Sequence, residues 1–283
     1  MVRAEQVTGP VAYHGEGPVW SERWGGLRWV DMFAGDVLSL ADDGGIDRHH
    51  VGTIAAVLRP RHRGGAVIGV ERGFALEEAD GTLWRLDELW SDTHVRMNEG
   101  GCDPDGRFYC GSMAYDHRTG AGALYRLDPD GSVRVVLENV TISNGLEWSP
   151  DGSRAYYNDS PTQRIDVFDY EVESGLSGRR TFAKVPAEVG LPDGLTVDEE
   201  GGVWVALYGG GSVRRYTPDS MLDEVIEVPA KQVTACTFGG RDLDQLFITT
   251  SREDLKPSED PLAGSLFRTA VGVAGMPVRE FVG

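Results

Sequence analysis

Four residues with oxygen-bearing side chains stand at matching positions in this sequence: Glu16, Asn98, Asn144 and Asp193. Two carboxylates and two amides in one small space would repel one another and lose hydration unless a positive charge compensated them. A divalent cation does this, and an all-oxygen set suits a hard ion, Ca²⁺ first and then Mg²⁺ or Mn²⁺. Arg96, two residues before Asn98, would lie on the same face of a strand, where it could hydrogen-bond a polyol or a carboxylate.

These four residues belong to a repeat that runs along the whole chain. Its six copies, 40 to 49 residues apart, begin at Glu16, Ala56, Asn98, Asn144, Asp193 and Thr234. A period in the forties with about four short strands per copy is typical of a β-propeller blade. Because blades surround an axis, we expect the first residues of the copies to converge on a central channel.

Short apolar runs joined by turns dominate the sequence. Asp-Gly pairs, which favour hairpin turns between such runs, occur at 43–44, 80–81, 105–106, 130–131, 151–152 and 193–194. We therefore predict an all-β fold, a six-bladed β-propeller with four-stranded antiparallel blades, as one domain over residues 1–283. The segment 2–11 would complete the last blade and close the ring, and residues 264–281 would supply outer strands of that blade.

Composition excludes several classes of partner. The 283 residues carry 45 acidic and 27 basic side chains, a net charge of −18. We expect no nucleic-acid partner and no anionic membrane surface, because both need clustered Lys and Arg. No run approaches the ~20 apolar residues of a membrane span, and the start lacks the apolar core of a signal peptide. Three cysteines without zinc-type spacing favour reduced thiols in a cytoplasmic protein. The oligomeric state stays open.

Each candidate residue could instead have a purely structural role, as part of a turn or of the surface. Residues 191–194 and 143–145 have the composition of turns, and Glu16 taken alone would be a surface glutamate. The shared register of all four copies favours a common site instead.

Other polar residues near these positions could support, orient or cover the site. His14 lies two residues before Glu16 and is more typical of a packed or supporting histidine. Asp31 and residues 158–159 end matching strands and could orient the site. Residues 115–118 could form a loop over the channel mouth.

Six strings occur in order along the chain: HGEGPVW, RMNEGGCDPDGRFYCGSMA, GALYRLDPDG, SNGLEWSPDGSRAYYNDS, LPDGLTVDEEGGVWVA and TACTFGGRDLDQLFITT. Together they resemble the regucalcin/gluconolactonase family, also called senescence marker protein-like, which includes luciferin-regenerating enzymes. The resemblance runs from about residue 13 to residue 281. It implies a six-bladed propeller with one divalent cation in its channel, and usually the hydrolysis of sugar lactones.

The resemblance also implies roles for individual residues. Glu16 matches the metal-binding glutamate of the E-G-P motif, and Asn144 matches the metal-binding asparagine of N-G-L. Asp193 matches the aspartate of P-D-G-L, which is both a metal ligand and the proposed catalytic base. Arg96 and Asn98 match the substrate-contacting pair of the R-x-N motif. The cation would be Ca²⁺ first, with Zn²⁺, Mn²⁺, Mg²⁺ or Fe²⁺ as alternatives.

The chain departs from the family pattern at two places. The usual N-D-G after the arginine is here Asn98-Glu99-Gly100, which would alter the hydrogen bonds around the site. Some members carry a substrate-contacting glutamate in the loop that corresponds to residues 115–122, and this loop has none. The particular sugar therefore does not follow from the resemblance.

The function we expect is the metal-dependent opening of a small-molecule sugar lactone, an aldonolactone, to the aldonic acid. The cation would polarise the carbonyl and Asp193 would assist the water. One alternative is a calcium-dependent organophosphate hydrolase of the diisopropylfluorophosphatase type, in which Asn98 would be a direct metal ligand. A second alternative is a non-catalytic, calcium-binding regulatory propeller.

Overall fold

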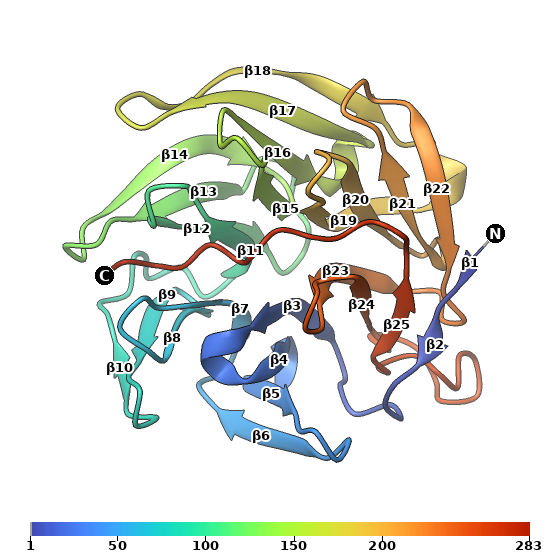
Figure 1. Cartoon of the computed structure of the whole chain (residues 1–283). Helices are drawn as coiled ribbons and strands as arrows, with labels where there is room; N and C mark the ends of the chain where they lie inside the picture. The colour runs from blue at the N-terminus through green and yellow to red at the C-terminus, as the bar shows by residue number, and fades with distance from the viewer. Residues whose placement is uncertain (1) are drawn as a thin grey trace.

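The computed structural model describes residues 2–283, and in it six antiparallel sheets surround a central axis as the blades of a propeller (Figure 1). Within each blade the strand that comes first in the repeat lies innermost, and the next strands follow outward. The described helices are short 3-10 turns at residues 22–24, 32–34, 160–162 and 187–189. The predicted all-β, six-bladed propeller is therefore confirmed.

The first three blades use the strands in simple chain order. Blade 1 contains β3 (Gly15–Ser21), β4 (Gly26–Asp31), β5 (Asp36–Leu40) and β6 (Ile46–His50). Blade 2 contains β7 (Ala55–Pro60), β8 (Ala66–Val70), β9 (Gly73–Glu77) and β10 (Leu83–Arg85). Blade 3 contains β11 (Val95–Cys102), β12 (Phe108–Ala114), β13 (Gly122–Leu127) and β14 (Val133–Val140).

Blade 4 also uses strands in simple chain order, whereas blades 5 and 6 each add one strand from the start of the chain. Blade 4 contains β15 (Ser143–Trp148), β16 (Arg154–Asp159), β17 (Arg164–Glu171) and β18 (Gly175–Lys184). Blade 5 contains β19 (Leu191–Val197), β20 (Val203–Tyr208), β21 (Ser212–Tyr216), β22 (Leu222–Glu227) and β1 (Val2–Arg3). Blade 6 contains β23 (Val233–Gly239), β24 (Gln245–Thr250), β25 (Phe267–Ala270) and β2 (Glu5–Gln6).

The N-terminal segment closes the ring by pairing with the end of the chain. Strand β2 pairs antiparallel with β25, with Glu5 opposite Arg268. The predicted role of this segment is thus confirmed, and it has a second part that the sequence did not indicate. Strand β1 continues into the neighbouring blade and pairs in parallel with β22.

Turn chemistry explains how the strands follow one another so closely. In five of the six Asp-Gly pairs the glycine has φ between 72° and 85°, the left-handed conformation that glycine adopts without strain. The sixth pair behaves differently. Asp193-Gly194 lies inside β19 rather than at a hairpin turn, so its turn-like composition does not describe its structure.

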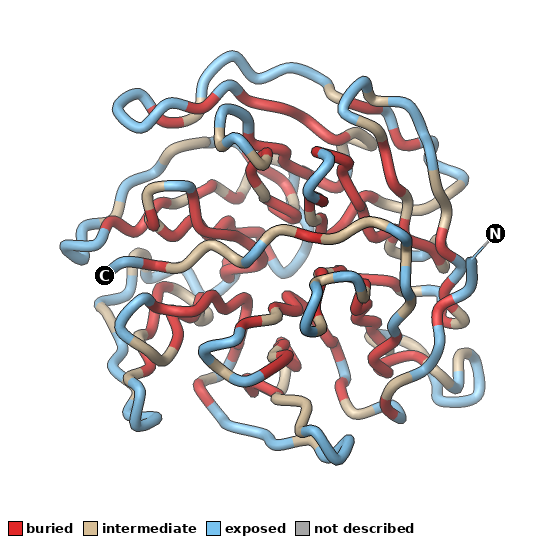
Figure 2. Tube along the Cα trace, viewed as in Figure 1, coloured by how far each residue is buried: buried red, intermediate tan, exposed pale blue. Residues whose placement is uncertain are grey.

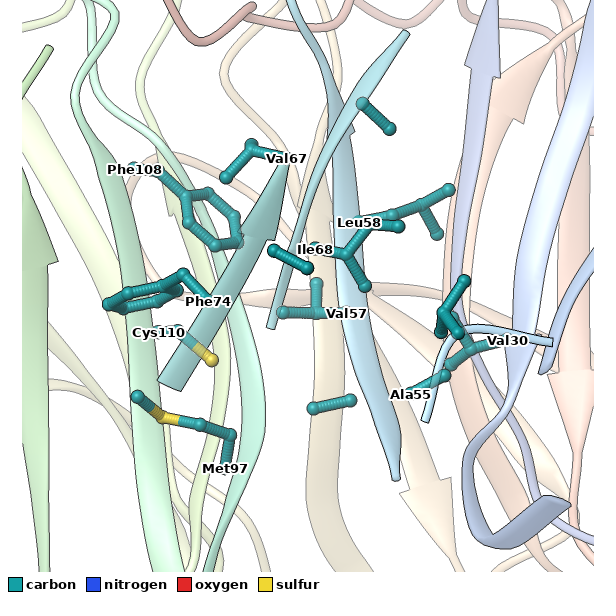
Figure 3. Close-up of a cluster of buried hydrophobic side chains, with 14 of the residues drawn as sticks. Val30, Ala55, Val57, Leu58, Val67, Ile68, Phe74, Met97, Phe108 and Cys110 are labelled. Carbon is teal, nitrogen blue, oxygen red and sulfur yellow. The ribbon is translucent and has the colours of Figure 1, made fainter. Parts of the chain in front are cut away.

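The hydrophobic core lies between neighbouring blades. Figure 3 shows one such cluster, which includes the fully buried residues Val57 and Leu58 of β7, Phe74 of β9 and Phe108 of β12. Burial is concentrated in the inner strands, whereas the hairpin loops and several outer strands are exposed (Figure 2). The innermost strands are therefore held rigidly, because each is packed against strands of the adjacent blades.

The C-terminal segment crosses one end of the channel (Figure 1). We predicted outer strands over residues 264–281, and this was wrong beyond β25, because residues 271–283 leave blade 6. Backbone hydrogen bonds join this segment to Glu199, Leu243, Pro60 and Gly106, which lie in four different blades. Arg279 donates to the carbonyls of Trp148 and Ser149 in blade 4, and Glu280 pairs with Arg23 in blade 1. The segment therefore straps all six blades at that end.

Candidate active site

The first residues of the six repeats lie near the opposite end of the channel, at irregularities of the innermost strands. In each of these strands the pairing with the second strand skips one residue, so that a β-bulge forms. The bulges fall between Glu16 and Val19, Ala55 and Val57, Met97 and Gly100, Ser143 and Leu146, Pro192 and Leu195, and Val233 and Ala235. A bulge bends the strand and redirects a side chain, and it is a common device beside functional sites.

The bulges bring the predicted residues to one cavity. Glu16, Arg96, Asn98, Asn144 and Asp193 all line a cavity of about 140 Å³ at this end of the channel. Each of these five residues is at most 5% exposed. The structure therefore brings together residues that the chain separates by up to 177 positions.

The other two repeats do not place their first residues in the cavity. Ala56 has an apolar side chain, and Thr234 turns its hydroxyl to donate to the carbonyl of Gly15 at 2.6 Å. Neither residue lines the cavity. Four blades thus supply the predicted oxygen-bearing set, and blade 6 reaches the cavity through a different residue, Glu253.

A continuous series of hydrogen bonds orients the amides. Arg96 Nη1 donates to Asn98 Oδ1 at 2.6 Å, and Asn98 Nδ2 donates to Asn144 Oδ1 at 2.9 Å. Asn144 Nδ2 then donates to Ser160 Oγ at 2.7 Å, and Ser160 donates to the carbonyl of Pro192 at 2.7 Å. Because every bond runs in the same direction from blade 3 to blade 5, the amide oxygens and nitrogens have one consistent assignment.

Burial disfavours the charged forms of the two carboxylates, and the nearby charge of Arg96 offsets this only in part. Burial raises the pKa of Glu16, and burial together with the negative charges of Glu16, Glu99 and Glu253 raises the pKa of Asp193 well above its ordinary value. Glu16 Oε2 accepts a hydrogen bond from the Gly17 amide at 2.9 Å. The Asp193 carboxylate accepts none from residues 2–283. The site therefore has an excess of negative charge in an environment that disfavours it.

Arg96 is the cation that lines the cavity, and it is itself tightly held. Its guanidinium lies 5.1 Å from the Phe33 ring and 5.7 Å from the Tyr115 ring. Tyr115 in turn donates to Glu71 Oε1 at 2.8 Å. Burial lowers the pKa of Arg96. Nη2 makes no hydrogen bond within residues 2–283, so a donor is left for a bound molecule.

His14 connects two carboxylates on the same side of the cavity. Its Nδ1 lies 2.8 Å from Ser251 Oγ and 3.3 Å from Glu253 Oε2, and its Nε2 lies 4.0 Å from Glu16 Oε1. The ring packs edge-on against Phe33, with 5.0 Å between the centroids. His14 is therefore a buried supporting residue beside the site.

Two aspartates anchor the backbone that leads into the site. Asp31 Oδ1 accepts from the amides of Tyr13 and His14 at 3.0 and 3.1 Å. Asp159 makes the equivalent bonds in blade 4, to the amides of Thr141 and Ile142. These contacts give both residues the orienting position that the sequence indicated.

Several lining residues could not be found from the repeat. Met113, Ile142, Leu191, Ser160, Tyr208 and Glu253 complete the wall of the cavity, together with His14 and His117. Glu253 comes from a long connection in blade 6 that has no counterpart in the other repeats. The apolar members lie beside the polar ones and were indistinguishable from core residues in the sequence.

Glu99 lies just beyond the cavity, toward the strapped end. It shares a bulge with Asn98, but it lines a small enclosed space with Arg59 and Arg279. A side chain at Gly194 would approach Glu99 Oε1 to 3.0 Å, so the glycine leaves room for the longer glutamate. Burial and the charge of Glu16 raise the pKa of Glu99 well above its ordinary value.

The chemistry of the donors limits which metal could bind. Within residues 2–283 no group of three or more His, Cys, Asp and Glu side chains is arranged to hold an ion. The cavity offers two carboxylates and amide oxygens instead, with a surplus of negative charge. This set fits a hard divalent cation such as Ca²⁺. Asn98 Oδ1 and Asn144 Oδ1 each accept one hydrogen bond, from Arg96 Nη1 at 2.6 Å and from Asn98 Nδ2 at 2.9 Å, and an amide oxygen has a second lone pair. The predicted ligands Glu16, Asn144 and Asp193 could therefore hold it, and so could Asn98.

Comparison with known proteins shows the family of the chain. The family model described as "SMP-30/Gluconolactonase/LRE-like region" matches residues 14–252. The chain belongs to this family. The match includes all five of the predicted site residues and all six innermost strands.

Individual members of the family are similar along nearly the whole chain. Regucalcin of Danio rerio is 35% identical over 281 residues, covering 95% of each chain. A Bacillus subtilis protein whose name places it among sugar lactone lactonases, YvrE, is 35% identical over 278 residues, again covering 95% of each. The solved structure of a calcium-binding protein, regucalcin, from Agrobacterium tumefaciens superposes with a TM-score of 0.91 at 28% identity. It covers 99% of this chain and 97% of that one.

Two general features accompany the family fold. Cys102, Cys110 and Cys236 are buried and form no disulfide. Across residues 2–283, no helix has the length and apolar character needed to cross a membrane.

Proposed function

We propose that this protein hydrolyses a sugar lactone with the help of one divalent cation. The observation that carries the proposal is the pair of buried carboxylates that line the cavity, Glu16 and Asp193, whose pKa values burial raises although the charge of Arg96 acts to lower them. Membership of a family that includes a named sugar lactone lactonase supports the reaction.

In this proposal Glu16, Asn144 and Asp193 hold the cation, with Ca²⁺ the first candidate. When bound, the ion would supply Lewis-acid polarisation of the lactone carbonyl. The fixed orientation of the amide supports the role of Asn144, because its Nδ2 donates to Ser160, while its Oδ1 accepts one bond from Asn98 Nδ2 and keeps a second lone pair.

The remaining roles belong to side chains that face the cavity. Asp193 accepts a proton from the attacking water, since its carboxylate receives no hydrogen bond from residues 2–283. Arg96 Nη2 and the neighbouring Asn98 hold oxygen atoms of the substrate. Met113, Ile142 and Leu191 form an apolar wall that excludes water from the rest of the ring.

The test is metal analysis of the purified protein, followed by a pH-drop assay on five- and six-membered sugar lactones. The assay is run on the protein as purified, after EDTA treatment, and after restoring Ca²⁺, Zn²⁺, Mn²⁺, Mg²⁺ or Fe²⁺ separately. We expect activity to disappear with the metal and to return with at least one ion. Undiminished activity after complete metal removal would contradict the cation's role.

A second candidate function is cation binding without turnover. It is favoured by the similarity to a solved regucalcin described as a calcium-binding protein, and it needs the same carboxylates. Tight Ca²⁺ binding with no hydrolysis of any lactone would support it. Phosphotriesters in the same panel test for organophosphate hydrolysis, the alternative in which Asn98 would be a direct metal ligand.

A further inference from the structure

Glu253 is a lining residue of the cavity that has no equivalent in the other blades. It lies just after β24, at the start of the long connection to β25, and its side chain is 31% exposed. It faces the same cavity as Arg96 and Asp193. A carboxylate at this place is accessible to a bound molecule, unlike the more deeply buried Glu16.

The backbone and side chain of Glu253 are both held in position. Its amide donates to Ser251 Oγ at 2.9 Å, and its carbonyl accepts from Gln232 Nε2 at 3.2 Å. His14 Nδ1 lies 3.3 Å from one carboxylate oxygen, Oε2. The other oxygen, Oε1, takes part in no hydrogen bond or ion pair within residues 2–283. One oxygen is therefore anchored, and one is available.

The charges around Glu253 keep it ionised. Burial acts to raise the pKa of its carboxyl, but the contact with His14 and the charges of His14, Arg96 and His117 outweigh burial and lower it. An ionised carboxylate can only accept hydrogen bonds, and a guanidinium can only donate them. The cavity therefore offers a free acceptor on blade 6 and a free donor, Arg96 Nη2, on blade 3.

A hydroxyl group is the ligand chemistry that satisfies both, because it donates and accepts at once. We propose that Glu253 is a specificity residue that accepts hydrogen bonds from hydroxyl groups of the lactone ring. The site would then prefer neutral, polyhydroxylated lactones to unsubstituted ones, and would disfavour lactones that carry a carboxylate. This inference rests on the proposed lactone hydrolysis for its substrate.

The kinetic test compares Glu253→Gln with wild type on glucono-1,5-lactone and on δ-valerolactone, which has the same ring without hydroxyls. Glutamine keeps the length of the side chain but removes the charged acceptor. We expect KM for the hydroxylated lactone to rise about tenfold, as for loss of a hydrogen bond to a charged group. The kinetics of δ-valerolactone should not change.

A matched control is Asp254→Asn, which removes the same charge from the next residue. Asp254 is exposed and does not line the cavity, and its φ of 56° is one that asparagine tolerates. This variant should behave as wild type on both lactones. An equal loss on both lactones in Glu253→Gln would overturn the proposal, since it would indicate an effect passed through His14 to Glu16.

A binding measurement separates failure of this inference from failure of the proposed function. Calorimetry with 1,5-anhydroglucitol, a cyclic polyol without a carbonyl, needs no hydrolysis. If wild type hydrolyses no lactone, the proposed reaction fails, while weaker polyol binding by Glu253→Gln still supports the residue's role. Equal polyol affinity of the two proteins would overturn that role, whatever the lactone assay gives.

Discussion

The two ends of the central channel are built from the same strands but treat charge in opposite ways. At the cavity end, Glu16 and Asp193 are buried, and neither forms a close ion pair with Arg96, so burial raises the pKa of both. At the other end, Glu147 pairs with Arg279 at 3.2 Å, and Glu280 pairs with Arg23. Charge that is satisfied within the chain holds the structure together, whereas charge that is left unsatisfied is available to a cation or a substrate.

The pairing of the innermost strands also differs between the two ends of the channel. Each innermost strand has its bulge near the cavity end, and pairing is regular toward the strapped end, as from Leu146 to Trp148 in β15. Regular pairing keeps side chains on the two faces of a sheet, packed between blades. The bulge turns one or two residues toward the axis instead. Within the innermost strands, irregular pairing is thus confined to the end where function is proposed.

The largest effect should come from Asp193→Asn at the cavity end. This change removes both a proton acceptor and a cation ligand, so we expect lactone hydrolysis to fall at least about 10³-fold. The fold should persist, because the variant also removes a buried charge whose pKa is raised. Activity assays with circular dichroism on the same samples check both parts. Full activity in a folded variant would remove Asp193 from its proposed role.

At the strapped end, Phe281→Ala should lower the stability of the protein and leave its activity unchanged, the opposite of the pattern expected for Asp193→Asn. Phe281 is 1% exposed and belongs to the cluster that includes Val57 and Phe108. Its truncation should lower the free energy of unfolding by about 3–5 kcal/mol, as measured by urea denaturation. Below the unfolding transition, kcat and KM should match wild type. Val282→Ala, at a residue 42% exposed, is the control and should change neither stability nor activity appreciably.

The repeat made the fold and much of the cavity predictable. The pattern of short apolar runs repeats six times, five Asp-Gly turns mark hairpins within it, and the register of Glu16, Asn98, Asn144 and Asp193 follows from that period alone. Turn composition misled at Asp193-Gly194, because the glycine there serves close packing, with Ala235 Cβ only 2.5 Å from where a side chain would begin. Local composition cannot distinguish a turn from a close approach between distant strands.

Residues outside the repeat were not predictable in the same way. Glu253 comes from an irregular connection, so no periodic position marks it. The last residues, 271–283, leave blade 6 because their partners, such as Pro60 and Gly106, lie far away in the chain. A pattern of short apolar runs cannot tell an outer strand from a strap that crosses the channel.

At the cavity end, Arg96→Ala tests the binding of the substrate rather than the hydrolysis step. The guanidinium is fixed between Phe33 and Tyr115, and it orients Asn98 through a 2.6 Å hydrogen bond. We expect KM to rise about tenfold or more, with a smaller change in kcat. Arg118→Ala is the control, since Arg118 is exposed and pairs with Asp116. An unchanged KM would take the substrate role away from Arg96.

Glu99, between the two ends, should give the smallest effect and the clearest dependence on pH. Its folded-state pKa is raised by burial and by the charge of Glu16, whereas a glutamate in the unfolded chain titrates near about 4.3. Below about pH 4.3 the Glu99 carboxyl is protonated in both the folded and the unfolded state, so it does not change the free energy of unfolding. As the pH rises, the unfolded chain releases the proton first, so this residue makes the folded protein progressively less stable until the folded-state pKa is passed.

Glu99→Gln keeps the volume and removes this penalty. In EDTA, its free energy of unfolding relative to wild type should therefore increase by about 1 kcal/mol or more between about pH 5 and about pH 8. The increase with pH is the decisive quantity, because an amide without a partner at this buried place costs a similar amount at every pH. Glu138→Gln, at an exposed residue of β14, should show no such increase. A flat difference for Glu99→Gln would mean that its charge is already compensated within the channel, which would place the unsatisfied charge in the cavity alone.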